Sequence, residues 1–148
     1  EVERGDDAEA AAVDQILPVI TGLIEQLLGL HACIDAEVRG DDVRLSMMQA
    51  TQVALMINEL IQNAVEHGFG TARTGDIHIN IESVDEVIGL WVSNNGDRFP
   101  HDFEVGKACS LGLNIVQNLA RSLGGHFRME NRLGWTVAEV KFSHLAPE

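Results

Sequence analysis

Apolar residues recur at three- and four-residue intervals in three stretches of the chain, and this spacing predicts three amphipathic helices. The predicted helices cover 10–30, then Ser46 as a candidate N-cap through to His67, and 113–123. Pro18 either kinks the first helix or lies near its true start, because proline has no N–H to donate inside a helix. Gly68 is well placed to cap the second helix, and Gly124-Gly125 ends the third.

Five shorter stretches have the pattern of strands, most clearly where Ile77, Ile79 and Ile81 alternate with polar residues. The predicted strands are 32–38, 76–81, 87–92, 126–131 and 135–142. Strands that follow one another through short turns predict a mixed, mostly antiparallel sheet. We therefore expect an α+β fold, a two-layer α/β sandwich with its helices on one face of the sheet.

Length and composition narrow the class of protein. The 148 residues, 45% of them hydrophobic, suffice for one domain, which we assign to 10–148 after a flexible acidic lead-in at 1–9. A net charge of -13 argues against nucleic acid as a partner, since that binding needs a basic face. No apolar run approaches the ~20 residues that cross a bilayer, so we expect no membrane contact by this domain.

Cysteine usage and the first residue bear on where the chain belongs. Cys33 and Cys109 match no zinc or thioredoxin spacing, and two thiols alone suggest a reducing compartment. We therefore expect a cytoplasmic protein. The chain starts at Glu1 rather than Met, which indicates a part of something longer.

One face of the central helix carries a polar stripe of Glu59, Asn63 and His67, four residues apart. A carboxylate, a carboxamide and an imidazole in one line can hold a metal ion, a phosphate and a water. The alternative is a solvated polar face, which is the commoner reason for such a stripe. The residues further along the chain decide between these two interpretations.

Two later segments have the composition of ligand-binding loops. Residues 93–110 show little periodicity, and a loop of that length inside a compact domain is typically a functional lid or a disordered segment. It opens with Asn94-Asn95-Gly96, which alone also fits a simple turn. It ends with Ser110-Leu-Gly-Leu113, where Gly112 allows close approach of the backbone and the N–H groups of the first helical turn can face phosphate oxygens. An ordinary Ser-capped helix start explains this second segment equally well.

Taken in order, the three segments resemble the sequence boxes of the ATPase superfamily that joins gyrase, the heat-shock chaperones, histidine kinases and mismatch-repair ATPases. Glu59 to His67 is similar to its N-box, and the sequence of this segment looks most like that of the catalytic domain of bacterial histidine kinases of the HWE type. The Asn94-x-Gly96-x-Arg98 segment resembles the Asp-x-Gly-x-Gly box, with Asn in place of Asp and Arg in place of the second Gly. Ser110 to Leu113 resembles the Ser-Leu-Gly-Leu box.

The resemblance implies a Bergerat-type ATPase fold that binds ATP and Mg²⁺ between the central helix and a lid at about 93–110. It implies Asn63 as the Mg²⁺ ligand, Glu59 as the general base or polarising carboxylate, and Asn94 as the acceptor for the adenine amino group. The other implied nucleotide-binding residues are His67, Gly96, Lys107, Ser110, Leu111, Gly112, Leu113 and Thr136. For Lys107 a solvated lid lysine, and for Thr136 an ordinary strand threonine, are the alternatives. Asn94 and Arg98 leave open whether ATP binding is weakened or abolished.

The function implied by the resemblance is that of a two-component sensor histidine kinase. The chain would transfer the γ-phosphoryl group of ATP to a histidine on a dimerisation domain elsewhere in the full-length protein, and a response regulator would be the next partner. We expect no autophosphorylation of these 148 residues alone. One alternative is a Ser/Thr protein kinase of the anti-sigma-factor type, and another is a degenerate, non-catalytic interaction module of the same fold.

Overall fold

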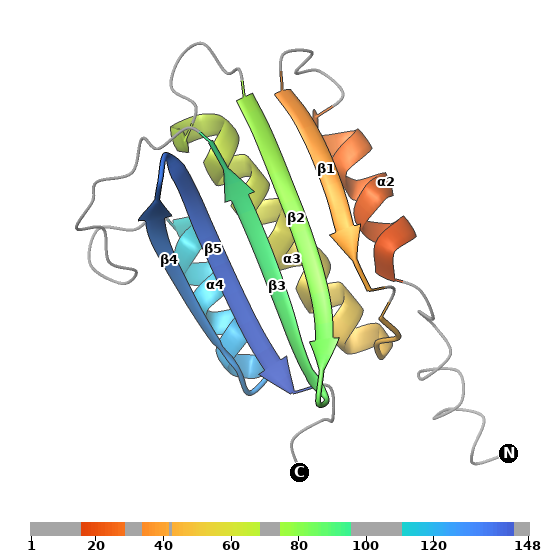
Figure 1. The fold of residues 1–148 in the computed structure, drawn as a ribbon. Coiled ribbons are helices and arrows are strands. Elements are labelled where there is room, and N and C mark those ends of the chain that lie inside the picture. Colours follow the sequence, from red (N-terminus) through yellow and green to blue (C-terminus); the bar gives the residue numbers. More distant parts are fainter. Residues whose placement is uncertain (1–15, 29–33, 42, 69–74, 96–110, 144–148) are drawn as a thin grey trace, which may run out of the picture.

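The computed structural model describes residues 16–28, 34–41, 43–68, 75–95 and 111–143 (Figure 1). The elements, in order, are α2 (Ile16–Leu28), β1 (Ile34–Gly40), α3 (Met47–Asn63), η1 (Ala64–Gly68), β2 (Gly75–Val84), β3 (Val87–Asn94), α4 (Leu111–Ser122), β4 (His126–Arg132) and β5 (Trp135–Ser143). The predicted lead-in at 1–9 lies outside the described residues.

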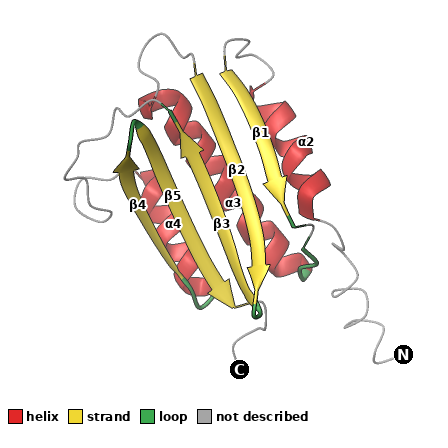
Figure 2. Ribbon diagram, in the orientation of Figure 1, coloured by secondary structure: helices red, strands yellow, loops and turns green. Residues whose placement is uncertain are grey.

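The strands form one five-stranded sheet in the order β1-β2-β3-β5-β4. The β1–β2 pair is parallel, and the pairs β2–β3, β3–β5 and β4–β5 are antiparallel. Figure 2 shows all three α-helices against the same face of this sheet. The predicted α+β two-layer fold, with a mostly antiparallel sheet, is confirmed.

Hydrogen bonds and one proline at their first residues explain where helices α2 and α3 begin. Ser46 caps α3 in a reciprocal capping box: its hydroxyl accepts from Gln49 N at 3.1 Å, and its own N–H donates to Gln49 Oε1 at 3.4 Å. Pro18 lies in the first turn of α2, where its missing N–H is not needed. The N–H of Ile16 donates to Val43 O at 3.2 Å rather than to a preceding turn. Of the two predicted roles for Pro18, the structure supports a place near the start of the helix.

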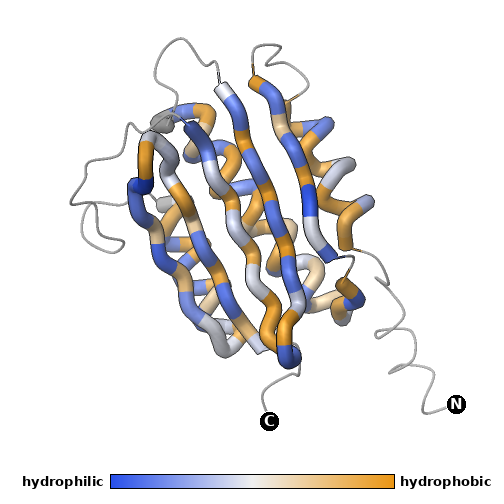
Figure 3. Tube along the Cα trace, viewed as in Figure 1, coloured by the Kyte–Doolittle hydropathy of each residue, from blue (hydrophilic) through white to orange (hydrophobic). Residues whose placement is uncertain are grey.

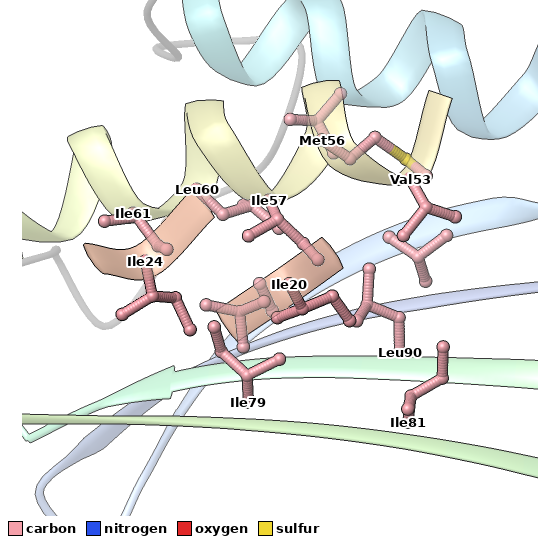
Figure 4. Packing of buried hydrophobic residues seen from close by; sticks show 14 of the residues in the cluster. Ile20, Ile24, Val53, Met56, Ile57, Leu60, Ile61, Ile79, Ile81 and Leu90 are labelled. Atoms are coloured by element: carbon pink, nitrogen blue, oxygen red, sulfur yellow. The ribbon is translucent and has the colours of Figure 1, made fainter. Parts of the chain in front are cut away.

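The core lies between the helices and the inner face of the sheet. Apolar and polar residues alternate along β2 and β5, so one face of each strand is apolar (Figure 3). Figure 4 shows Ile20 and Ile24 of α2 and Ile57 of α3 above Ile79 of β2. The side chain of Ile57 is fully buried, as are those of Met56, the residue before it, and of Val53, one turn earlier on the same helix.

The first strand differs most from its prediction. It runs from Ile34 to Gly40 instead of 32–38, and residues 29–33 lie outside the described part of the chain. Gly40 pairs with Ile81 in the parallel ladder at φ 120°, and an added Cβ there would lie 1.9 Å from Ile81 O. The structure uses this glycine for a close approach between two strands.

Candidate functional site

Four elements bring polar residues to one end of the sheet. Asn94, the last residue of β3, pairs with Thr136 near the start of β5, and Thr136 pairs with Asn131 near the end of β4. The carboxyl end of α3 lies at the same end (Figure 1). Helix α4 begins there too, because it leads through a short turn to His126, which pairs with Lys141 at the far end of the sheet.

A small cavity opens among these elements. It is lined by Leu60, Asn63, Ala64, Val92, Asn94, Met129, Thr136 and Ala138. Five of these residues are apolar and three are polar without charge. The empty space between them, including the open mouth, is ≈ 240 Å³. Its enclosed part, ≈ 10 Å³ measured at the centre of a water-sized sphere, has room for about one water molecule. A flat aromatic ligand can therefore enter only if a lining side chain moves. Among the lining side chains, the unbranched one of Met129 is the most adaptable.

Asn63 has the least satisfied side chain of the site. It is the last residue of α3 and only 7% exposed, yet neither its amide nitrogen nor its amide oxygen has a hydrogen-bond partner in the part of the chain that the structure describes. A buried polar group left in this state costs about 1–3 kcal/mol. A ligand that offers a donor and an acceptor here, or a metal ion bound to Oδ1, removes that cost.

Asn94 and Thr136 form the floor of the cavity. They are 5% and 2% exposed and lie opposite each other on adjacent strands. The hydroxyl of Thr136 donates to Asn131 Oδ1 at 3.0 Å. Because a hydroxyl has only one hydrogen, Thr136 offers any further partner nothing but oxygen lone pairs.

The residue after Asn94 fixes the end of strand β3. Asn95 N donates to Asp76 O at 3.3 Å, Asp76 N donates to Asn95 Oδ1 at 2.9 Å, and Asn95 Nδ2 donates to Asp76 Oδ2 at 3.0 Å. These three bonds attach the point where the chain leaves the sheet to the neighbouring strand β2. The sequence gives only a weak sign of this, an Asn-Asn pair directly after a strand.

The polar stripe predicted on α3 is interrupted at its end. The α-helix stops at Asn63, and Ala64–Gly68 form one turn of π-helix, which places His67 in a wider turn. The i, i+4 spacing that stacks side chains in an α-helix does not apply past Asn63, and the side chain of His67 lies outside the described residues. Glu59 is half-buried, accepts a bond from Asn58 Nδ2 at 3.4 Å, and does not line the cavity.

The remaining predicted site residues are placed only in part. Gly96, Lys107 and Ser110 lie outside the described residues, as does the side chain of Leu111. Gly112 is the second residue of α4, and Leu113 is 1% exposed in the core. The first turn of α4, with its N–H groups not bonded within the helix, thus begins at the end of the molecule where Asn63 lies.

Among the predicted residues, the structure brings Asn63, Asn94 and Thr136 together around one cavity. It adds five apolar lining residues that sequence reasoning did not identify, Met129 and Val92 among them. For Val92 and Met129, their positions along the predicted strands were the available signal. Within the described ranges, no group of three or more His, Cys, Asp or Glu residues is placed to hold a metal ion, and no helix is long and apolar enough to cross a membrane.

Residues 48–145 match the family of histidine kinase-, DNA gyrase B- and HSP90-like ATPases. The chain belongs to this family. The match includes the whole cavity and extends from the first turn of α3 past the end of β5. Family membership implies that this ATPase domain binds ATP.

Two groups of relatives extend the comparison. The ATPase domain is 33% identical over 112 residues to the sensor histidine kinase PdtaS of Mycobacterium tuberculosis, a match that covers 72% of this chain and 21% of PdtaS. It shares its fold with the blue-light activated histidine kinase EL346 of Erythrobacter litoralis, with a TM-score of 0.79 and 18% identity over 88% of this chain and 42% of that one. It also shares its fold with the histidine kinase ThkA in complex with the response regulator TrrA, with a TM-score of 0.70 and 24% identity over 88% of this chain and 40% of that one.

Proposed function

We propose that this ATPase domain is the catalytic domain of a cytoplasmic two-component sensor histidine kinase. It transfers the γ-phosphoryl group of ATP to a histidine on a dimerisation domain outside these 148 residues, from which a response regulator receives it. The similarity to PdtaS supports a kinase of this class, although the chain spans about a fifth of that protein. The complex of ThkA with TrrA supports the response regulator as partner.

The observation that carries the proposal is the buried amide of Asn63, which has no partner and lines a cavity together with Asn94 and Thr136. The apolar walls suit a purine base, and the buried amide of Asn94 and the hydroxyl of Thr136 suit its hydrogen-bonding edge. The Oδ1 of Asn63 is an oxygen ligand of the type that Mg²⁺ prefers. Mg²⁺ typically takes one or two protein ligands and completes its shell with phosphates and water, so the site fits it without an acidic cluster.

We assign the other roles from the resemblance of the sequence boxes to those of the family. Asn63 would hold Mg²⁺, which when bound offsets phosphate charge. The N–H groups at the start of α4, from Ser110 to Leu113, would hold phosphate oxygens, together with Lys107 and His67. Gly96 would let the lid backbone approach the nucleotide. Glu59 would act as general base or polarising carboxylate toward the incoming imidazole.

Calorimetric titration of the domain with Mg-ADP and Mg-ATP tests the nucleotide site. We expect binding to the wild-type chain and at least a tenfold loss in Asn63→Ala. Gln62→Ala is the matched control, because Gln62 is the exposed neighbour of Asn63 on the same helix. Absence of nucleotide binding to the wild type would favour a non-catalytic interaction module of the same fold.

Phosphoryl transfer is tested in a chimera in which this chain replaces its matching segment of PdtaS. With labelled ATP we expect acid-labile, alkali-stable phosphate on the chimera, none on the isolated chain, and strong loss of label in a Glu59→Gln chimera. Acid-stable phosphate on serine or threonine of a partner protein would instead indicate the anti-sigma-factor type of kinase.

A further inference from the structure

The cavity is lined by one alanine from each layer of the fold, Ala138 of β5 and Ala64 at the start of η1, and both are buried. We infer that Met129, which pairs with Ala138 from the neighbouring strand β4, determines how large a base the cavity admits. It excludes purines that carry a bulky substituent on their hydrogen-bonding edge. This inference rests on the proposed function, since it assumes that a nucleotide base occupies the cavity.

Two rows of cavity-lining residues form the sheet side of the site. The first row is the polar pair of Asn94 on β3 and Thr136 on β5. The second row lies two residues further along each strand, about 7 Å away, and consists of Val92 on β3, Ala138 on β5 and Met129 on β4. A base whose hydrogen-bonding edge meets the first row therefore points a substituent on that edge at the second row.

Met129 is the member of the second row that limits the space. Ala138 has no side chain beyond its Cβ, and the side chain of Val92 is branched and only 3% exposed. Met129 is longer, unbranched and half-buried, and among the described residues its strand β4 has a neighbouring strand on one side only (Figure 1). Its side chain can therefore fill the space beside Ala138 and also move aside for a ligand.

The size of the cavity predicts the strength of the selection. Because the enclosed part has room for about one water molecule, an unsubstituted purine already requires Met129 to move. A substituent adds atoms to a site that is already filled, which corresponds to about a tenfold or greater loss of affinity. Shortening Met129 opens space beside Ala138, whereas lengthening Ala138 removes it.

The test compares Mg-ADP with the Mg²⁺ complex of N6-benzyl-ADP by calorimetry on the whole chain. The two nucleotides share the sugar, the phosphates and the metal, so the ratio of their dissociation constants reports on the base site alone. For the wild type we expect the benzyl nucleotide to bind at least about thirtyfold more weakly than ADP. For Met129→Ala we expect this ratio to fall by about tenfold or more. Met48→Ala is the matched control and should keep the wild-type ratio, because Met48 is 63% exposed and lies outside the cavity lining.

Ala138→Val tests the same space in the opposite direction. It should weaken the binding of Mg-ADP by about tenfold or more, because its two added methyl groups occupy the space that the base needs. Combining it with Met129→Ala should restore most of the lost affinity, because the second change frees the volume that the first one fills. A purely structural role of Met129 would alter stability without this compensation in nucleotide affinity.

A wild type that binds the two nucleotides within about threefold overturns the inference and leaves the proposed function intact. A folded Met129→Ala variant with the wild-type ratio also overturns it. If Met129→Ala does not fold, Ala138→Val decides: an unchanged affinity for Mg-ADP overturns the inference, and a tenfold loss supports it. If Mg-ADP does not bind to the wild type, the proposed function fails and this inference fails with it.

Discussion

The two ends of helix α3 treat their polar groups in opposite ways. At the amino end, Ser46 and Gln49 satisfy each other's backbone N–H groups, and Ser46 O accepts from Ala50 N at 2.9 Å. At the carboxyl end, the α-helix passes into a π-helical turn, and the last α-helical residue, Asn63, has a buried amide with no partner.

We attribute this difference to two roles: the amino end of α3 holds the fold together, and the carboxyl end belongs to the proposed ligand site. A reciprocal cap stabilises the helix whether or not anything is bound. A buried amide without a partner lowers stability and is retained where function needs it. Changes at the amino end should therefore alter stability alone, and changes at the carboxyl end should alter ligand binding.

The largest expected effect is that of the ligand itself. Saturation with Mg-ADP at about one hundred times its dissociation constant should raise the free energy of unfolding by about 2.7 kcal/mol. For a domain of this size that corresponds to a shift of roughly 5–10 °C in Tm. Thermal unfolding with increasing Mg-ADP, and Mg²⁺ alone as control, measures it. An unchanged Tm at saturation would show that the carboxyl end of α3 is not a ligand site.

Replacing the unpartnered amide of Asn63 by an apolar side chain should stabilise the domain, whereas most core substitutions destabilise it. Asn63→Leu keeps the number and branching of the side-chain heavy atoms and removes two buried polar atoms, so the nucleotide-free domain should gain about 1–3 kcal/mol in stability. The same variant should lose the stabilisation by Mg-ADP. Denaturant unfolding with and without nucleotide measures both effects. A destabilised variant that still responds to Mg-ADP would contradict the assignment of Asn63.

At the amino end, Ser46→Ala removes the cap of α3. We expect a loss of about 1 kcal/mol in the free energy of unfolding, because one N–H of the first turn loses its acceptor. The dissociation constant for Mg-ADP should stay within about twofold of the wild type. A much weaker affinity in a variant that is still folded would mean that the two ends are energetically coupled.

The smallest effect is expected at Gln62. Its side chain is exposed and donates to Asn58 Oδ1 at 3.2 Å, one turn back on the helix. Gln62→Ala should change stability by less than about 0.5 kcal/mol and leave nucleotide affinity unchanged. Both are read from the unfolding and titration experiments above. A large effect here would weaken any conclusion drawn from its neighbour Asn63.

Much of the fold was predictable because its signals are local. Helix α3 starts at Ser46 as expected, and the hairpin of β4 and β5 turns where Leu133 and Gly134 both take positive φ. The strand ends were less predictable. The sequence predicted that the first strand ends at 38, but β1 continues to Gly40, whose partner is Ile81, forty-one residues later.

Side-chain contacts on the outer face of the sheet were also not predictable from the sequence. Periodicity places Trp91 and Trp135 in predicted strands but does not indicate what their side chains contact. In the structure Trp91 donates to Glu139 Oε2 at 3.0 Å, and the ring of Trp135 lies 4.7 Å from that of His78. His78 is on β2 and Trp135 on β5, with β3 between them, so this contact depends on the order of strands in the sheet.

The sequence by itself determined the elements and the core, and it named candidate residues for the proposed nucleotide site, because periodicity, caps and box spacing are contained in short stretches of chain. Only the tertiary structure decided that Asn63, Asn94 and Thr136 share one cavity, that Asn63 lacks a partner there, and that Glu59 lies outside its lining. Whether a buried polar atom is satisfied depends on neighbours from distant segments, and no local pattern contains that information.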